Sequence, residues 1–254
     1  MKGDIYPLVL LNFYCITGVV NISSKIIKTI FFYVMLQILF KLMFILLHIN
    51  KFPISDSLVY ILVTIVLYIK FCDDKHFNFT FDKKYIIPTC LLLFGMIIVC
   101  DILSELSLYM FPIKSSFYKD IFENIGNEKP LKLFFEVVII GPIFEEMVFR
   151  KIILKELLNK HTKNIAIVIS ALIFSLIHLN IWQFFTAFPI GIILGLMFYE
   201  TDSVFLCIIF HSLYNLSIFL NFDIHKTNNI DYIICFMIGI FITVLGLKLI
   251  KSKS

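Results

Sequence analysis

Two adjacent glutamates, Glu145 and Glu146, are followed one helical turn later by Arg150 in an otherwise apolar stretch. Residues four apart share a helix face, so Glu146 and Arg150 can form an ion pair with the acid in its favourable N-terminal position. Glu145 then points about 100° away around the helix, where its carboxylate is available for proton transfer. A simpler interpretation is a helix end at which Arg150 extends its guanidinium to phosphate groups. The preceding Gly141 and Pro142 can open the helix locally.

Two further polar pairs follow at the same spacing. Phe174 and His178 are four apart, as are His211 and Asn215, so the members of each pair share a helix face. An imidazole and a carboxamide on one face offer donors to a developing oxyanion, and an imidazole also serves in acid–base catalysis. The alternatives are a packing histidine and an interhelical polar clamp, worth about 0.6 kcal/mol in membranes. No serine or cysteine lies in a recognisable nucleophile elbow, and the chain has no HExxH motif.

The elements that position these residues are predicted to be membrane helices. Of the 254 residues, 60% are hydrophobic and 16% are charged, whereas soluble domains are about half apolar and about a quarter charged. Nine apolar runs occur, at 5–20, 30–49, 57–71, 85–103, 131–149, 164–179, 183–199, 204–220 and 232–250. Backbone groups in lipid must be satisfied within the segment, so each run predicts a helix. The expected fold is an all-α, polytopic transmembrane bundle of about eight spans, or nine if residues 5–20 also cross.

Ionisable residues within such helices are informative, because a charge at the bilayer centre costs at least about 2.5–3.5 kcal/mol. Such residues face the bundle interior and usually have a function. Here two glutamates, an arginine, two histidines and an asparagine converge on three predicted helices. Acid–base chemistry needs a carboxylate or imidazole near a water, together with preorganised donors. The combination therefore favours catalysis over packing.

The distribution of charge predicts orientation and excludes one class of partner. The connection 150–163 is the most basic, which places it in the cytoplasm, and the C-terminus with Lys248, Lys251 and Lys253 shares that side. The segment 112–130 is the longest polar stretch and is predicted to be a surface helix or a lid. The net charge of +4 is ordinary for a membrane protein, and without a basic stripe the chain is not expected to bind nucleic acid.

The three motifs together resemble those of a known family. Glu145-Glu146-x-x-x-Arg150, Phe174-x-x-x-His178 and His211-x-x-x-Asn215 occur in the order found in the CPBP family of intramembrane proteases, also called Abi or the CAAX-prenyl-protease-2-like family. The match covers about a third of the chain. The implied organisation is one integrated membrane domain with variable helices at 1–130, the catalytic helices at 131–220, and a last helix with a basic tail at 221–254.

The resemblance implies hydrolysis of a peptide bond inside the membrane. When the family's roles are matched to this sequence residue by residue, Glu145 resembles the general base that activates water. His178 resembles the residue that helps to hold that water. Glu146 and Arg150 resemble structural or orienting residues. His211 and Asn215 resemble the pair that stabilises the oxyanion. Since none of these positions departs from the family pattern, an active enzyme is expected.

No cofactor is expected, because the spacing gives no dedicated metal motif and asparagine is a poor zinc ligand. The alternative is zinc held by His178, His211 and Glu145 with one open position. The expected partners are a peptide or membrane-anchored protein substrate and the lipid bilayer. The abundance of Ile, Phe, Lys and Asn is typical of an AT-rich bacterial genome, so a multi-pass protein of a bacterial cell membrane is predicted.

Three functional hypotheses remain open at this stage. The first is an intramembrane endopeptidase that serves bacteriocin or signal-peptide processing or self-immunity. The second is a non-catalytic bacteriocin immunity or regulatory membrane protein that keeps the polar set for packing. The third is a small proton-coupled transporter, but the sequence shows no inverted repeats.

Overall fold

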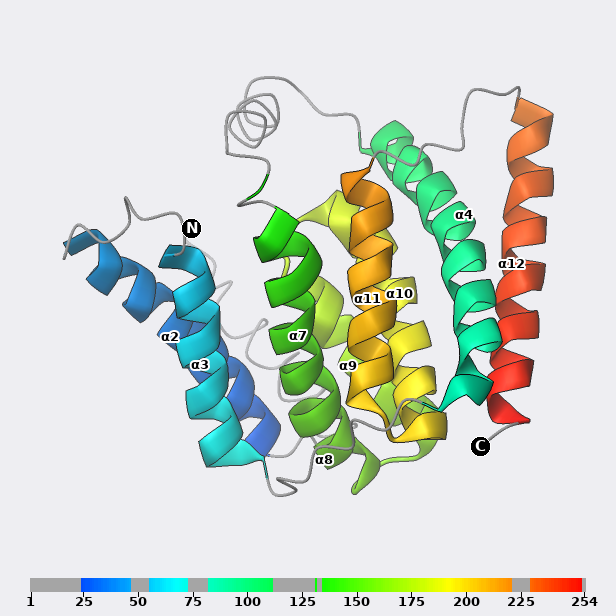
Figure 1. The fold of residues 1–254 in the computed structure, drawn as a ribbon. Coiled ribbons are helices and arrows are strands. Elements are labelled where there is room, and N and C mark those ends of the chain that lie inside the picture. The colour runs from blue at the N-terminus through cyan, green and yellow to red at the C-terminus, as the bar shows by residue number, and fades with distance from the viewer. Residues whose placement is uncertain are drawn as a thin grey trace, which may run out of the picture.

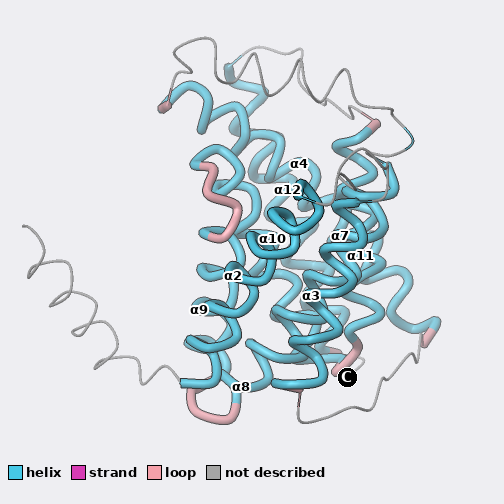
Figure 2. The backbone as a smooth tube through the Cα atoms, turned by 90° about the vertical axis from the view of Figure 1, so that its left-hand side faces the viewer, coloured by secondary structure: helices cyan, strands magenta, loops and turns pink. Residues whose placement is uncertain are grey.

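The computed structural model describes residues 24–46, 55–72, 82–111, 131, 134–220 and 229–252. Every regular element in these ranges is a helix, so the predicted all-α class is confirmed for them. The helices run side by side along one direction, and two views at right angles agree on this (Figures 1 and 2). Each predicted apolar run from residue 30 onward overlaps a helix within the described residues, although the run 164–179 extends past the end of its helix at Leu176. The predicted run 5–20 and the polar segment 112–130 lie outside the described residues.

Two helix pairs form the flanks of the bundle. On one side α2 (Ser24–Leu46) packs with α3 (Ser55–Phe71), and on the other α4 (Ile86–Met110), which follows the short 3-10 turn η2 (Lys83–Tyr85), packs with α12 (Asn229–Lys251) (Figure 1). The α4–α12 contact needs glycine, because a Cβ added at Gly95 would lie 2.5 Å from Thr243 Oγ1. Small residues at such crossings let two backbones approach closely, as is common between membrane helices.

The helix that carries Glu145 is a continuous rod with two stretches of π-helical register. It consists of η3 (Phe135–Ile140), α7 (Gly141–Glu146), η4 (Met147–Leu154) and α8 (Lys155–Leu158). At the end of η3 the N–H of Gly141 donates to the carbonyl of Glu136, five residues back rather than four. The predicted opening at Gly141 and Pro142 is therefore a change of register and not a break. Such π turns inside α-helices are frequent at functional sites.

Three consecutive helices pack beside this rod: α9 (Lys163–Leu176), α10 (Ile181–Thr201) and α11 (Val204–Phe219). With 14 residues, α9 is about 21 Å long, well short of the roughly 30 Å hydrocarbon core. A helix of this length that starts at one interface ends within the membrane, and His178 follows that end. The link to α10 is tight, since Leu179 has a left-handed φ of 52° and Asn180 caps the N–H groups of Trp182 and Gln183.

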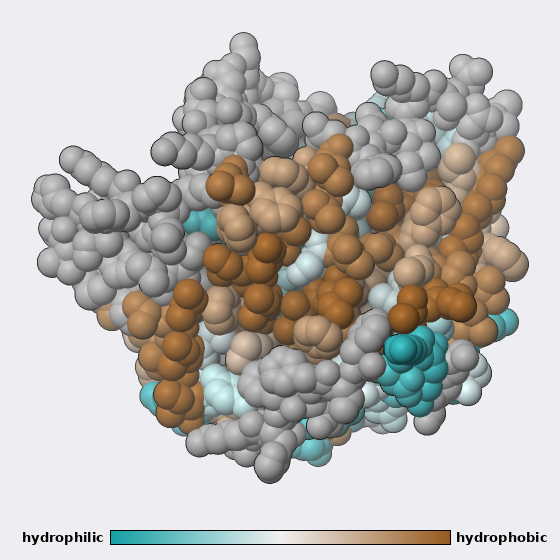
Figure 3. Space-filling model, in the orientation of Figure 1, coloured by the Kyte–Doolittle hydropathy of each residue, from teal (hydrophilic) through white to brown (hydrophobic). Residues whose placement is uncertain are grey.

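Several of the described helices suit a membrane by length and composition. Three are long and apolar enough to cross it, namely Lys83–Met110, Ile181–Thr201 and Tyr232–Lys251. Shorter apolar helices are Ile61–Phe71, Lys163–Leu176 and Val204–Phe219. Apolar side chains also cover most of the described surface in the view of Figure 3. The helices thus confirm the prediction of a multi-pass membrane protein. The number of spans, eight or nine, stays a prediction.

Basic residues collect at the end of the bundle that carries α8. Ion pairs join neighbouring elements there: Lys25–Glu156, Lys155–Asp202 and Lys163–Glu200. The described C-terminal end of α12, with Lys248 and Lys251 in its last turn, lies at the same end (Figure 1). The connection 150–163 and the C-terminal turn therefore share one side, as the charge pattern predicts. The positive-inside rule predicts that this side faces the cytoplasm.

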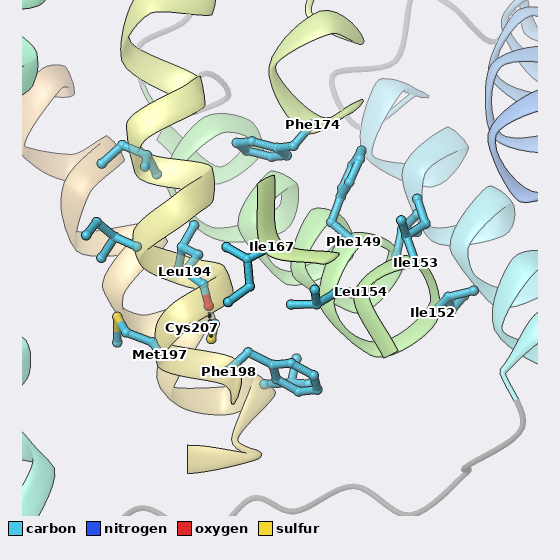
Figure 4. Packing of buried hydrophobic residues seen from close by; sticks show 14 of the residues in the cluster. Phe149, Ile152, Ile153, Leu154, Ile167, Phe174, Leu194, Met197, Phe198 and Cys207 are labelled. Carbon is cyan, nitrogen blue, oxygen red and sulfur yellow. Dashed lines mark hydrogen bonds between the residues drawn. The ribbon is translucent and has the colours of Figure 1, made fainter. Parts of the chain in front are cut away.

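The core between the rod and α9–α10 fixes α9 against the glutamate-bearing helix. Phe149 of η4 and Phe174 of α9 meet edge to face with ring centroids 5.0 Å apart. Ile167 and Leu194 continue this cluster toward the α8 end (Figure 4). Helices in a membrane associate by close packing of side chains, since lipid tails are as apolar as the side chains themselves. We therefore expect this ring contact to hold the end of α9 in a fixed place.

Candidate active site

A cavity of about 390 Å³ lies between the rod and the ends of α9, α10 and α11. Four of the six predicted site residues line it: Glu145, His178, His211 and Asn215. The remaining two, Glu146 and Arg150, are fully buried behind it. The structure therefore brings together all six residues that the motifs single out, from the rod, from α11 and from the turn after α9.

The two carboxylate oxygens of Glu146 each have a separate partner. Nε of Arg150 lies 2.7 Å from Oε2 of Glu146, so the predicted ion pair forms, with both side chains fully buried. The other carboxylate oxygen, Oε1, lies 2.9 Å from Nδ1 of His211. A buried charge is tolerated only when it is paired and hydrogen-bonded, and this carboxylate satisfies both conditions. It thereby couples the rod to α11.

The contact with Glu146 determines the tautomer of His211. The carboxylate accepts the hydrogen bond, so Nδ1 carries the hydrogen. Nε2 then lies 3.9 Å from Oε2 of Glu145, too far for a direct hydrogen bond but within reach of a bridging water. Nε2 is an acceptor in the neutral ring and a donor in the imidazolium. The predicted oxyanion role of His211 therefore requires its charged form.

His178 is held by its own chain. Its Nδ1 lies 2.8 Å from the carbonyl oxygen of Phe174. A carbonyl only accepts, so Nδ1 carries the hydrogen and Nε2 is the acceptor that remains for the cavity. The role expected for His178, to help hold the attacking water, needs such an acceptor and stays a prediction. The contact with Phe174 follows from the four-residue spacing at the last turn of α9.

The ring of Phe174 contacts three of the polar site residues. It meets the imidazoles of His178 and His211 edge to face, with centroids 5.1 Å and 5.8 Å away, and the guanidinium of Arg150 lies 5.2 Å from its centroid. Aromatic pairs and cation–π contacts of this kind are worth about 0.5–1.5 kcal/mol each. The motif spacing placed Phe174 beside His178, but its contacts with Arg150 and His211 come only from the packing.

Ser170 is a site residue that the sequence reasoning missed. Its hydroxyl oxygen lies 3.4 Å from Nη1 of Arg150 and accepts that N–H, while the hydroxyl donates to the carbonyl of Phe149 at 3.3 Å. Among the described residues, Nη2 of the same arginine has no partner. The only sequence signal for Ser170 is a small polar residue four before Phe174 in an apolar run.

Asn215 contacts the backbone of the glutamate-bearing rod. Its Nδ2 donates to the carbonyl oxygen of Val137 at 2.9 Å. Since that carbonyl can only accept, the carboxamide nitrogen must be the atom that faces it. The second hydrogen on Nδ2 and the oxygen Oδ1 remain. Because Asn215 lines the cavity, the second hydrogen is available to a ligand there.

Other polar residues of the cavity wall were not predicted. They are Glu136 of the rod, Gln183 and Thr186 of α10, and Tyr214 of α11. Tyr214 lies inside the His211-x-x-x-Asn215 motif, and Glu136 is a carboxylate in an apolar run. The sequence therefore gives a signal for each residue, but not for the direction in which Glu136 points. Nothing in the sequence predicts that Gln183 and Thr186 line a site, because uncharged polar residues are common near the ends of helices.

A zinc site would need Glu145, His178 and His211 close enough together to share one ion. Within residues 24–46, 55–72, 82–111 and 134–252 apart from 221–228, no three His, Cys, Asp or Glu side chains come close enough together to hold a metal ion. Glu145, His178 and His211 line one cavity, but they do not form such a group.

Comparison with known proteins identifies relatives. Residues 127–217 match the family model described as Type II CAAX prenyl endopeptidase Rce1-like. The chain is 36% identical over 144 residues to the membrane-embedded CAAX protease MroQ of Staphylococcus aureus (strain USA300), a match that covers 52% of this chain and 57% of that protein. It is 30% identical over 168 residues to the UPF0177 protein YbdI of Lactococcus lactis subsp. lactis (strain IL1403), which covers 62% of this chain and 89% of that protein. No solved structure gives a significant match.

Proposed function

The chain belongs to the CPBP family of CAAX-protease-like membrane proteins, and we propose that it is an endopeptidase that hydrolyses a peptide bond of a membrane-associated peptide or protein. The observation that carries this proposal is the position of Glu145. Its carboxylate lines the cavity, 3.9 Å from Nε2 of His211, with His178 on the same wall. Glu146 is engaged by Arg150, so Glu145 is the carboxylate of the pair that remains for proton transfer.

Glu145 acts as the general base in this proposal. A water held between its carboxylate and Nε2 of His178 attacks the carbonyl carbon of the scissile bond. Glu145 accepts one proton of that water as the new carbon–oxygen bond forms. The π electrons of the carbonyl move to its oxygen and give a tetrahedral oxyanion. A well-placed base contributes about 10²–10⁴-fold to the rate.

Asn215 and His211 stabilise the oxyanion. Asn215 donates the N–H that is not bound to Val137. His211 donates from Nε2 as an imidazolium, whose charge is balanced by Glu146 at Nδ1, in the way a buried carboxylate supports a catalytic histidine. With His211 charged, the two negative charges of Glu145 and Glu146 balance the two positive charges of Arg150 and His211. Losing one preorganised oxyanion donor typically costs about 10²–10³-fold in rate.

The intermediate then collapses with proton return. Glu145 delivers its proton to the amide nitrogen as the carbon–nitrogen bond breaks, and the electrons of that bond stay on the nitrogen. The products are a new carboxyl terminus and a new amine. The carboxylate of Glu145 is regenerated, so water is the only co-reactant.

We propose that the reaction needs no metal. The Nδ1 hydrogen of His178 is donated to a carbonyl, so Nε2 of His178 can accept a hydrogen bond from the attacking water. The carboxylate of Glu145 on the same cavity wall can then remove the proton without a Lewis acid. Incubation of the purified protein with EDTA or 1,10-phenanthroline is expected to leave the cleavage rate unchanged. A loss of activity that added zinc restores would favour the zinc alternative.

The substrate class proposed is a peptide or a membrane-anchored protein, because the cavity lies among apolar helices of the kind that suits a membrane. Bacteriocin or signal-peptide processing, or self-immunity, is the proposed setting, since both relatives are bacterial proteins. The chain spans just over half of the CAAX protease relative, so that protein's activity supports the proposal but does not define the substrate.

The proposal is tested with purified protein in lipid nanodiscs and a library of quenched fluorescent peptides with apolar centres. Wild type is expected to cleave a subset, and Glu145→Gln to lose at least 100-fold of the rate while keeping its fold. Glu200→Gln is the matched control, since Glu200 pairs with Lys163 at the α8 end, away from the cavity. Equal cleavage by wild type and Glu145→Gln would favour the non-catalytic immunity or regulatory protein.

A further inference from the structure

The hydrogen bond between Asn215 and Val137 exists because the rod leaves a carbonyl open. In a helix each carbonyl accepts from an N–H four residues ahead, or five ahead in π register. For the carbonyl of Val137 these donors belong to residues 141 and 142. The N–H of Gly141 is bound to the carbonyl of Glu136. Residue 142 is a proline and has no N–H.

A helix carbonyl that has no donor within its own segment is costly among apolar helices unless another group supplies the donor. Asn215 of α11 supplies that donor at 2.9 Å. The contact fixes the plane of the carboxamide, because one hydrogen of Nδ2 must point at Val137. The other hydrogen is then directed by the planar geometry of the amide, and both Asn215 and Val137 line the cavity.

We propose that Pro142 is a positioning residue for the oxyanion donor. By lacking an N–H it reserves the carbonyl of Val137 for Asn215, and so it orients the second N–H of Asn215 toward the reacting carbonyl. Pro142 is itself buried and is not among the residues that line the cavity, and its side chain has no group that could take part in the reaction. The orientation of Asn215 toward a reacting carbonyl rests on the proposed function. The absence of an N–H at Pro142, which leaves the carbonyl of Val137 to Asn215, does not depend on activity.

The first test is a thermal double-mutant cycle on the full-length protein in detergent. Pro142→Ala restores an N–H that can bind Val137 in the π register. In the wild-type background Asn215→Ala is expected to lower Tm by about 4 °C, because it orphans a carbonyl. In the Pro142→Ala background the same change is expected to lower Tm by less than half as much. Pro189→Ala, which alters a proline inside α10, is the control and should leave the effect of Asn215→Ala unchanged.

The second test is kinetic and uses the best fluorogenic peptide from the library. Pro142→Ala is expected to lower kcat about tenfold with KM changed less than twofold, as for a misdirected oxyanion donor. Adding Pro142→Ala to Asn215→Ala should cause no further loss of kcat. Additive losses in Tm and in kcat would overturn the inference while leaving the protease intact. If wild type cleaves no peptide, the proposed function fails, and the Tm cycle alone decides whether Pro142 reserves the carbonyl.

Discussion

His211 Nδ1 lies 2.9 Å from Oε1 of Glu146, although the two residues are 65 positions apart in the chain. Glu146 in turn binds Arg150 within its own helix at 2.7 Å. A single buried carboxylate thus connects the positive charge of the rod to the imidazole that faces Glu145. The geometry makes Glu146 an orienting residue whose loss affects both stability and the state of His211.

Glu146→Gln is therefore expected to destabilise the protein strongly. It leaves the guanidinium of Arg150 buried without its counter-charge, which typically costs about 3–5 kcal/mol. Size-exclusion profiles and thermal denaturation in detergent would measure the effect. The double variant Glu146→Gln with Arg150→Met is the control, since removing both charges should recover much of the stability. Equal instability of the single and double variants would argue against the ion pair as the cause.

Ser170→Ala is expected to cost about 1–3 kcal/mol, because it removes a hydrogen-bond partner from the buried Nη1 of Arg150 and another from the carbonyl of Phe149. Ser175→Ala is a matched control on the same helix. Ser175 is also buried, but its hydroxyl donates to Leu172 in its own helix. Thermal denaturation of both variants is the measurement, and similar shifts in Tm would show that the contact with Arg150 contributes nothing special.

Phe174→Leu is expected to lower kcat more than it lowers Tm. The substitution keeps apolar volume but removes the ring that contacts two imidazoles and the guanidinium of Arg150. Loss of these contacts, about 0.5–1.5 kcal/mol each, lets the imidazoles reorient. Phe198→Leu serves as the control, because Phe198 is buried in the same core but lies away from Phe174 (Figure 4). Equal losses of kcat in the two variants would contradict a positioning role.

Leu179→Gly is expected to stabilise the turn after His178. Leu179 adopts a φ of 52° and its side chain is 94% exposed, so it has backbone strain and little packing to lose. Relief of that strain, less the entropy cost of glycine, predicts a gain of about 0.5–1 kcal/mol. Leu179→Ala retains the Cβ and should give no gain. A Tm for the glycine variant at or below that of the alanine variant would refute the strain argument.

The site shows which contacts could be predicted from sequence. The Glu146–Arg150 pair and the Phe174–His178 contact each lie within four residues of one helix, and both were predicted by spacing. The sequence does not predict that Glu136 also lines the cavity. In a regular α-helix, a separation of nine residues places Glu136 about 180° around the helix axis from Glu145. Both carboxylates face the cavity because the π register of η3 advances fewer degrees per residue.

The sequence by itself determined the apolar helices, the polar residues that must face their interior, and the pairs four residues apart. These are consequences of composition and of helix geometry, which act within one segment. Only the tertiary structure decided that Glu146 binds His211, that Ser170 supports Arg150, and that Asn215 takes the carbonyl of Val137. Those contacts join different helices, and they depend on the rotation and register of each helix in the packed bundle. No spacing along the chain encodes that arrangement.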